Sequence, residues 1–116
     1  AWGTWSPEAV TSALDEGRPV YVDFTAAWCV TCQVNKKTAY PSKVQALFRK
    51  HEVLLLKADN TNRDPAISAA IRELGRAAVP VNVLYVPGDE IPHLTTELLT
   101  AGYMANFLED RLGGRK

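Results

Sequence analysis

Two cysteines, Cys29 and Cys32, are the only thiols of this chain, and their spacing predicts redox chemistry. They follow a run of residues typical of a β-strand and come at the start of a run typical of an α-helix. A C-x-x-C pair at such a junction, with no further cysteine, favours thiol–disulfide exchange. That reaction needs an exposed attacking thiolate and a second thiol close enough to resolve the mixed disulfide.

The expected helix start indicates a different role for each sulfur. Cys29 lies at the helix N-terminus, where unpaired backbone N–H groups and the helix dipole stabilise negative charge. We therefore expect the pKa of Cys29 to lie below the value of about 8.5 of a free cysteine. Cys32, one turn further along, is expected to be more buried and to act as the resolving thiol.

Two other uses of the cysteine pair remain possible. A purely structural disulfide would close a very short loop, so it would stabilise the fold little through chain entropy. A zinc ion would need two ligands besides the thiols, and the only histidines, His51 and His93, have no recognisable ligand spacing. The sequence therefore predicts no metal and no cofactor other than the redox-active pair itself.

Length and charge limit the remaining function classes. The 116 residues are enough for one domain with a core and too few for two. Basic and acidic residues each number 13, and this zero net charge favours neither nucleic acid nor a membrane surface as partner. No apolar run approaches the ~20 residues of a spanning helix, and the start lacks a signal-peptide pattern. Because the chain starts without methionine, we expect a domain of a longer protein, monomeric as a domain.

The hydrophobic pattern predicts alternating helices and strands in the order α-β-α-β-α-β-β-α. The expected helices cover residues 7–16 with Ser6 as cap, 29–39 with a second stretch to 50 capped by Ser42, 62–75, and 103–112. The expected strands cover residues 19–25, 53–58 and 81–86, with a last one within 92–99. Residues 20, 22 and 24 point to one side of the first strand and residues 21 and 23 to the other, which is typical of a central strand covered on both faces. Trp2 and Trp5 flank the first helix and are expected to anchor it.

The segment Asp-Phe-Thr-Ala-Ala-Trp-Cys-Val-Thr-Cys, residues 23–32, resembles the active-site segment of the thioredoxin superfamily. The order of elements matches its α/β fold, a central mixed sheet flanked by helices, with an N-terminal helical extension over residues 1–116. The Trp-Cys-Val-x-Cys form, the leading Trp-Ser-Pro and the closing Thr-Ala-Gly-Tyr are similar to the C-terminal periplasmic domain of the DsbD family of transmembrane thiol:disulfide reductases. The related ScsB-type reductases carry similar domains.

This resemblance implies roles for individual residues. Cys29 matches the nucleophile and Cys32 the resolving cysteine, while Trp28 matches the aromatic residue that lines the exposed sulfur. Asp23 matches a buried acid beneath the pair, whose raised pKa would let it exchange a proton with Cys32. The alternative for Asp23 is an acid that faces solvent in a surface ladder.

The resemblance also identifies Val79 and Pro80 as the cis-proline segment that packs against the disulfide. In the cis form, the N–H and C=O of Val79 can pair with an extended substrate segment. The alternative is an ordinary trans proline that starts a strand.

Lys36 departs from the pattern of the DsbD family, which has a glutamate one helical turn after the second cysteine. A cation favours a nearby thiolate, so we expect Cys29 to be more acidic here than in the typical member. The alternative for Lys36 is a solvated helix lysine. Neither Val30 nor Thr31 is the histidine that strongly oxidising members have between the cysteines, which favours a reducing or relay role.

The resemblance predicts an electron relay between protein thiols and disulfides. The implied donor is the transmembrane part of the same protein, and the implied acceptor is its N-terminal periplasmic domain or another periplasmic thiol protein. The implied location is the periplasm, as a domain of an inner-membrane protein. Two alternatives remain: a free-standing thioredoxin that reduces many substrates, and a thioredoxin-fold interaction module with a structural disulfide.

Overall fold

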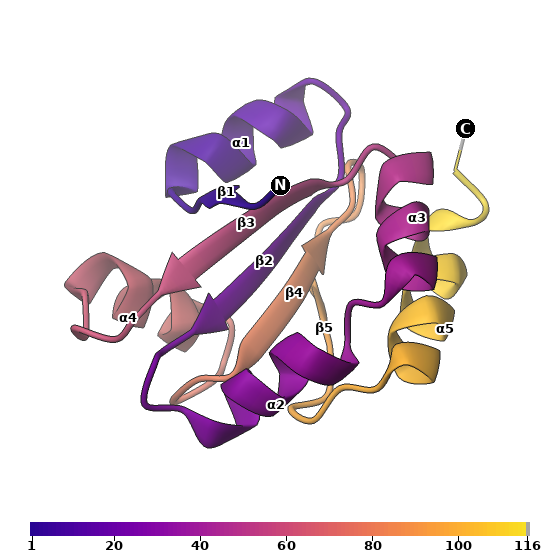
Figure 1. The fold of residues 1–116 in the computed structure, drawn as a ribbon. Helices are drawn as coiled ribbons and strands as arrows, with labels where there is room; N and C mark the ends of the chain where they lie inside the picture. The colour runs from indigo at the N-terminus through magenta and orange to yellow at the C-terminus, as the bar shows by residue number, and fades with distance from the viewer. Residues whose placement is uncertain (116) are drawn as a thin grey trace.

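The computed structural model describes residues 1–115 and contains one mixed five-stranded sheet. The strands run in the spatial order β1-β3-β2-β4-β5, with β1, β2 and β3 parallel and β4 and β5 antiparallel to their neighbours (Figure 1). Their bounds are β1 Gly3–Thr4, β2 Val20–Thr25, β3 Leu54–Asp59, β4 Val81–Tyr85 and β5 His93–Leu94. This is the thioredoxin fold that the sequence predicts.

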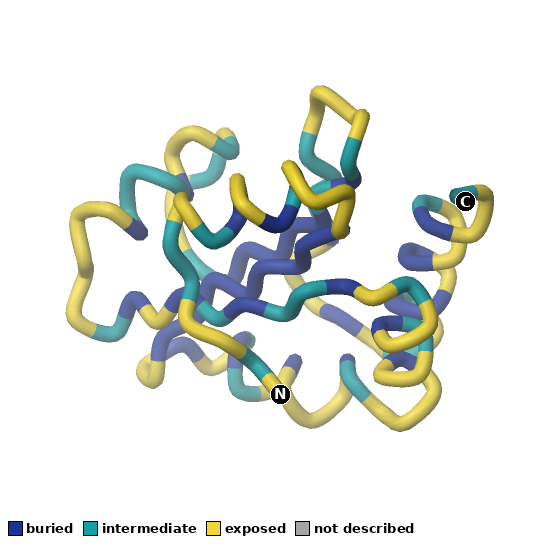
Figure 2. Tube along the Cα trace, turned by 90° about the horizontal axis from the view of Figure 1, so that it is seen from above, coloured by how far each residue is buried: buried dark blue, intermediate teal, exposed yellow. Residues whose placement is uncertain are grey.

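Five helices cover the two faces of the sheet. They are α1 Pro7–Asp15, α2 Val30–Thr38, α3 Ser42–Lys50, α4 Pro65–Glu73 and α5 Ala101–Leu112. One core lies between the sheet and helices α1 and α4, and the other lies between the sheet and helices α2, α3 and α5 (Figures 1 and 2). Among the residues that the structure describes, no helix has both the length and the apolar character needed to cross a bilayer.

Strand β2 is the centre of the fold, because all six of its residues are buried. Its alternation is as expected: Val22 and Phe24 belong to the core under α1 and α4, whereas Tyr21 belongs to the core under α2, α3 and α5. Burial on both faces is what a near-continuous apolar strand requires. The end of β2 is therefore held in place before the chain reaches the cysteines.

Some boundaries differ from the sequence-based expectation for local reasons. Helix α5 begins two residues earlier, because the hydroxyl of Thr100 caps it by accepting the N–H of Tyr103 at 3.1 Å. The prediction that Ser42 caps its helix was wrong: Ser42 is the first helical residue, and Pro41 occupies the cap position without a side-chain hydrogen bond. The last strand contains only two residues.

Strand β1 was not predicted, because two residues are too few to show an alternating pattern. The flanking tryptophans hold it at the sheet edge. Trp2 packs edge-on against Tyr40 with ring centroids 5.4 Å apart and also contacts Tyr21 and Phe48. Trp5 packs against Phe24 on the opposite face, at 5.7 Å. The N-terminal segment therefore connects both cores.

Replacing Trp2 by alanine tests this connection. We expect Trp2→Ala to lower the free energy of unfolding by about 2–3 kcal/mol, because a half-buried indole with several aromatic neighbours is lost. Urea unfolding followed by circular dichroism measures the change. The control is Ile91→Ala, whose side chain is 76% exposed and should change stability by less than about 0.5 kcal/mol. Equal effects of the two substitutions would contradict the anchoring role.

Candidate active site

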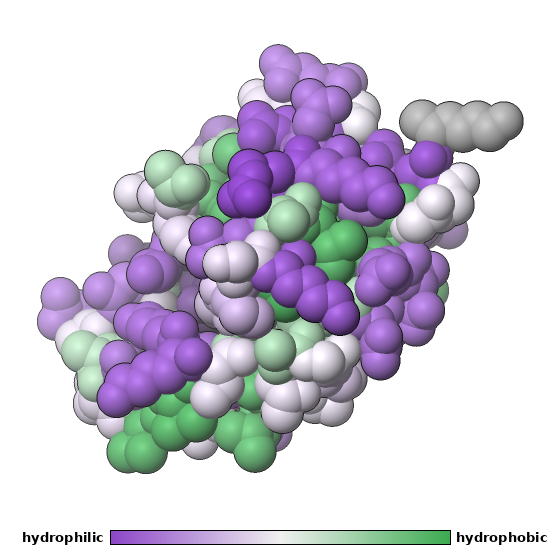
Figure 3. All heavy atoms as spheres, turned by 45° about the vertical axis from the view of Figure 1, so that its right-hand side comes forward, coloured by the Kyte–Doolittle hydropathy of each residue, from purple (hydrophilic) through white to green (hydrophobic). Residues whose placement is uncertain are grey.

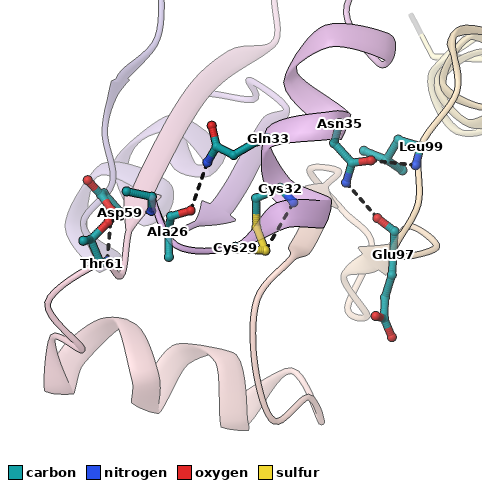
Figure 4. The surroundings of a disulfide bond; sticks show 10 residues. Ala26, Cys29, Cys32, Gln33, Asn35, Asp59, Thr61, Glu97 and Leu99 are labelled. Carbon is teal, nitrogen blue, oxygen red and sulfur yellow. Dashed lines mark hydrogen bonds between the residues drawn. A yellow bond between two sulfur atoms is a disulfide. The ribbon is translucent and has the colours of Figure 1, made fainter.

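The two cysteines form a disulfide at the N-terminus of α2, with their Cα atoms 5.2 Å apart (Figure 4). Cys29 is the N-cap residue, and its Sγ accepts the backbone N–H of Cys32 at 3.2 Å. Residue Cys29 is 7% exposed and Cys32 is 3% exposed. The order is as predicted, but Cys29 is much less exposed than expected, because Ala26 and Val79 pack against the disulfide.

The loop after β3 holds the segment that precedes the cysteines. The Thr61 hydroxyl accepts the backbone N–H of Ala27 at 2.8 Å, and the Thr61 carbonyl accepts the indole N–H of Trp28 at 3.1 Å. Thr61 in turn donates its hydroxyl and its N–H to the Asp59 carboxylate, and these bonds lower the pKa of Asp59. The Arg63 guanidinium lies 4.8 Å from the centre of the Trp28 ring. Trp28 is thus fixed beside Cys29 while remaining 48% exposed.

On the other side of α2, a buried amide ties the helix to the loop before α5. Asn35 donates its side-chain N–H to the Glu97 carbonyl at 2.8 Å and accepts the N–H of Leu99 at 2.9 Å. Thr38 donates its hydroxyl to the Leu99 carbonyl at 2.8 Å. Figure 4 shows Asn35 reaching this loop from the helix that carries the cysteines. The loop therefore has a fixed position relative to the sulfurs.

Val79 and Pro80 are joined by a cis peptide bond, as the resemblance implies, and the trans alternative was wrong. Val79 packs against the cluster of Ala26 and the two cysteines. Within residues 1–115, its backbone N–H and C=O take part in no hydrogen bond. An extended chain that lies beside Val79 can use both groups, as an added strand would.

Asp23 is buried at the centre of the sheet, so the alternative of an acid that faces solvent in a surface ladder was wrong. In the register of β2 it lies opposite Lys57 of β3 and Asn82 of β4, and it is 7% exposed. Burial raises the pKa of its carboxyl group from 3.8 to about 6, because desolvation disfavours the charged form. The charges of Lys57 and Lys36 act in the opposite direction and favour the carboxylate.

Lys36 lies on α2, the helix that carries the cysteines, and its charge acts on Asp23. Lys36 follows Cys32 by four residues in α2, so both side chains lie on one face of this helix. Asp23 follows Tyr21 by two residues in β2, so its side chain points to the face of the sheet that α2, α3 and α5 cover. The charge of Lys36 lowers the pKa of Asp23. Lys36 is itself exposed, and it also lowers the pKa of Asp59. Its effect on Cys29 stays a prediction.

Sequence reasoning missed Thr61, Asn35 and Asp59, which position the site through contacts across the chain. Asn35 and its partner Leu99 are 64 residues apart, and no local spacing indicates such a pair. Asp59 and Thr61 do carry a signal, since an Asp-x-Thr directly after a strand is typical of a side-chain-stabilised turn. That signal indicates a turn but not its contact with Trp28.

In the described part of the chain, neither histidine forms a hydrogen bond or ion pair with a cysteine. His93 pairs with Asp89 at 2.8 Å next to the β4–β5 turn, and His51 is the C-cap residue of α3. Over the described range, residues 1–115, no three side chains of histidine, cysteine, aspartate or glutamate gather as a metal site requires.

This chain is similar to a protein family and to several known proteins. A family model described as thioredoxin-like matches residues 1–87. The thiol:disulfide interchange protein DsbD of Yersinia enterocolitica is 33% identical over 81 residues, which are 69% of this chain and 14% of that protein. The protein of the same name from a Pseudomonas species is 37% identical over 110 residues, which are 89% of this chain and 18% of that protein. The chain thus spans less than a fifth of the length of these relatives.

Solved structures agree on the architecture. The oxidised C-terminal domain of Neisseria meningitidis DsbD superposes with a TM-score of 0.75 and 19% identity, covering 96% of this chain and 99% of that one. Chloroplastic thioredoxin z gives a TM-score of 0.68 with 19% identity and covers 97% of this chain and 96% of that one. At such identities the likeness concerns the fold. The family match over three quarters of the chain shows that this chain belongs to the thioredoxin-like family.

Proposed function

We propose that this chain relays electrons by thiol–disulfide exchange through Cys29 and Cys32, as a periplasmic domain of a DsbD-like membrane reductase. The observation that carries the proposal is the disulfide at the N-cap of α2, where the Sγ of Cys29 accepts a backbone N–H. The similarity to proteins named as thiol:disulfide interchange proteins supports the exchange chemistry. The small share of those relatives that the chain spans supports a domain of a larger protein.

The reaction transfers two electrons in two exchange steps. In the first, the Cys29 thiolate attacks one sulfur of a partner disulfide, which forms a mixed disulfide and releases the other partner sulfur as a thiolate. In the second, Cys32 loses its proton and attacks the Sγ of Cys29, which releases the partner's remaining thiolate. The partner is then a dithiol and the Cys29–Cys32 pair is oxidised. A dithiol of the membrane part of such a reductase restores the reduced pair by the reverse exchange.

The helix N-terminus favours the first step. The backbone N–H of Cys32 that points at the Sγ of Cys29, together with the dipole of α2, stabilises negative charge on that sulfur. Cys32 has no comparable position, because it lies inside the first turn and is nearly inaccessible. This difference supports attack by Cys29 and resolution by Cys32.

Asp23 serves the second step as the group that accepts the proton of Cys32. A carboxylate with a pKa of about 6 is largely ionised at neutral pH and is still basic enough to take a proton from a thiol in the transition state. Its place on the face of the sheet that α2, α3 and α5 cover supports this role. When the pair is reduced again, the same carboxyl group returns the proton.

The surface around the cysteines favours a protein as the redox partner. Four apolar side chains on α2, just before it, and in the loop hydrogen-bonded to it are widely exposed, namely Trp28 (48%), Val30 (77%), Val34 (41%) and Leu98 (61%). Figure 3 shows hydrophobic side chains gathered at the lower edge of the molecule, the end at which α2 lies in Figure 1. An exposed apolar patch of this kind is typical of an interaction site. Val79 adds the free backbone groups of an extended-chain contact.

The two alternative functions differ from this proposal in testable ways. A free-standing thioredoxin would use the same chemistry with many partners, and a structural disulfide would not cycle at all. The burial of an ionisable carboxyl at Asp23, which costs stability, favours a redox role over a structural one.

The reduction potential of the Cys29–Cys32 couple tests the direction of electron flow. We expect a value of roughly −200 to −270 mV, the range of reducing and relay members, because no histidine between the cysteines stabilises the reduced form. Equilibration in thiol buffers followed by alkylation and mass spectrometry measures it. A potential near about −120 mV marks an oxidant and would overturn the proposal. A pair that stays oxidised in every buffer would indicate a structural disulfide.

Replacing Asp23 by asparagine tests the proton transfer. We expect Asp23→Asn to slow the resolution step by about tenfold at pH 7, since no carboxylate accepts the Cys32 proton. The decay of a mixed disulfide between Cys29 and a chromogenic thiol measures that step. The control is Asp110→Asn, which changes an exposed acid of α5. An unchanged decay rate would remove Asp23 from the mechanism.

The same substitution changes the pH dependence of stability. Because the pKa of Asp23 is higher in the folded chain than in the unfolded chain, folding binds a proton between about pH 4 and 6. The free energy of unfolding therefore contains a contribution that is complete below pH 4 and is lost as the pH rises through 6, on the order of 3 kcal/mol. Asp23→Asn should abolish this contribution and be the more stable protein at pH 8, as measured by urea unfolding between pH 4 and 8.

Replacing Lys36 by glutamate tests the departure from the family pattern. We expect Lys36→Glu to raise the pKa of the Cys29 thiol, because the thiolate loses a nearby cation and gains an anion. The rate of alkylation by iodoacetamide as a function of pH gives that pKa. Lys37→Glu is the matched control, since Lys37 is the next exposed lysine of α2. If both variants titrate like the unchanged protein, Lys36 is a solvated surface residue.

A further inference from the structure

A hollow of about 340 Å³ lies beside the redox pair and is bounded by the site itself on one side. Trp28, the neighbour of Cys29, and Val79, which packs on the disulfide, form that side. The other side consists of α4 and the turns before and after it, and it contributes Arg63, Arg72 and Arg76. We call this hollow the arginine groove. A chain that contacts the sulfurs between Trp28 and Val79 lies at its edge.

The lining of the arginine groove carries positive charge. Three guanidinium groups line it, and no aspartate or glutamate does. Within residues 1–115, none of the three arginines lies in an ion pair with a carboxylate. The whole chain has 13 basic and 13 acidic residues, so this charge is a local concentration rather than a property of the composition.

The positions of these arginines suit a ligand at the groove. Arg63 is held over the Trp28 ring at 4.8 Å, in a turn where its backbone is left-handed with φ 55°. Arg72 is exposed on the last turn of α4, and Arg76 is half-buried just beyond it. A guanidinium group binds carboxylates through paired, charge-assisted hydrogen bonds. Three guanidinium groups along one hollow can therefore bind several carboxylates of one peptide segment.

We propose that the arginine groove binds an acidic segment of the partner protein, located next to the disulfide that Cys29 attacks. This inference rests on the proposed function and specifies its partner. The segment pairs with the free backbone groups of Val79 and places its aspartate or glutamate side chains against Arg72 and Arg76. Complementary charge at the rim of an interface mainly accelerates association and selects among partners. The arginine groove therefore gives this protein a preference for acidic partners, which the exposed apolar patch around α2 does not supply.

Peptides with matched sequences test the preference. Each contains one intramolecular disulfide flanked by four residues that are all glutamate, all glutamine or all lysine. The reduced 116-residue chain is mixed with each peptide in a stopped-flow instrument at low salt, and tryptophan fluorescence follows the exchange. We expect the second-order rate constant to be about tenfold higher for the acidic peptide than for the basic one, and the ratio to shrink as salt is added.

Substitutions in the groove locate the effect. We expect Arg72→Gln with Arg76→Gln to reduce the acidic-to-basic ratio by about fivefold, and Arg72→Glu with Arg76→Glu to invert the preference. The conservative pair Arg72→Lys with Arg76→Lys retains most of it. The matched control is Arg49→Gln with Lys50→Gln, which removes the same charge from the end of α3 and should leave the ratio unchanged.

The outcomes separate this inference from the proposed function. Equal rates for the three peptides, or a preference that survives the charge reversal, would overturn the arginine groove as a partner site while leaving disulfide reduction intact. A preference lost equally in the α3 control would assign it to overall charge and also overturn the inference. Failure to reduce any peptide, including the glutamine one, would instead contradict the proposed function.

Discussion

The hydrogen bond from the N–H of Cys32 to the Sγ of Cys29 is the contact on which the site depends. It exists because α2 starts directly after the loop that leaves β2, and because β2 is buried on both faces and cannot shift. The same junction orients the two sulfurs differently, one at the helix cap and one inside the first turn. Contacts from Thr61 and Asn35 then fix what surrounds the junction on either side.

A buried carboxyl group in the same sheet lowers the stability of the fold at neutral pH. Asp23 occupies a position where an apolar side chain would be more stable at neutral pH, since desolvation works against its charge. Lys57 on the neighbouring strand and Lys36 on α2 offset part of this cost, because their positive charges favour the carboxylate. The result is a carboxyl group with a pKa of about 6, which suits the proton transfer proposed for it.

The sequence predicts the parts of this molecule that depend on local patterns. The cysteine spacing at a strand–helix junction, the alternation along β2 and the helix signals Ser6-Pro7 and Gly17 all indicate the observed elements, and the cis-proline follows from the family resemblance. The rest depends on tertiary contacts. Two-residue β1 has no pattern, the exposure of Cys29 depends on Val79 fifty residues away, and the groove arginines come together only when α4 packs beside Trp28.

The two hydrogen bonds of the Asn35 side chain have a consequence for how a partner protein dissociates in the proposed relay. Because the side chain of Asn35 joins α2 to the loop with Leu98 through two hydrogen bonds, that loop keeps a fixed position relative to the sulfurs. We expect that breaking or forming the bond between two sulfurs one helical turn apart leaves these two hydrogen bonds in place. In the proposed relay, release after transfer then does not depend on a movement of this loop. A relay built this way needs complexes that are short-lived from the outset, with the covalent mixed disulfide providing the only long dwell time.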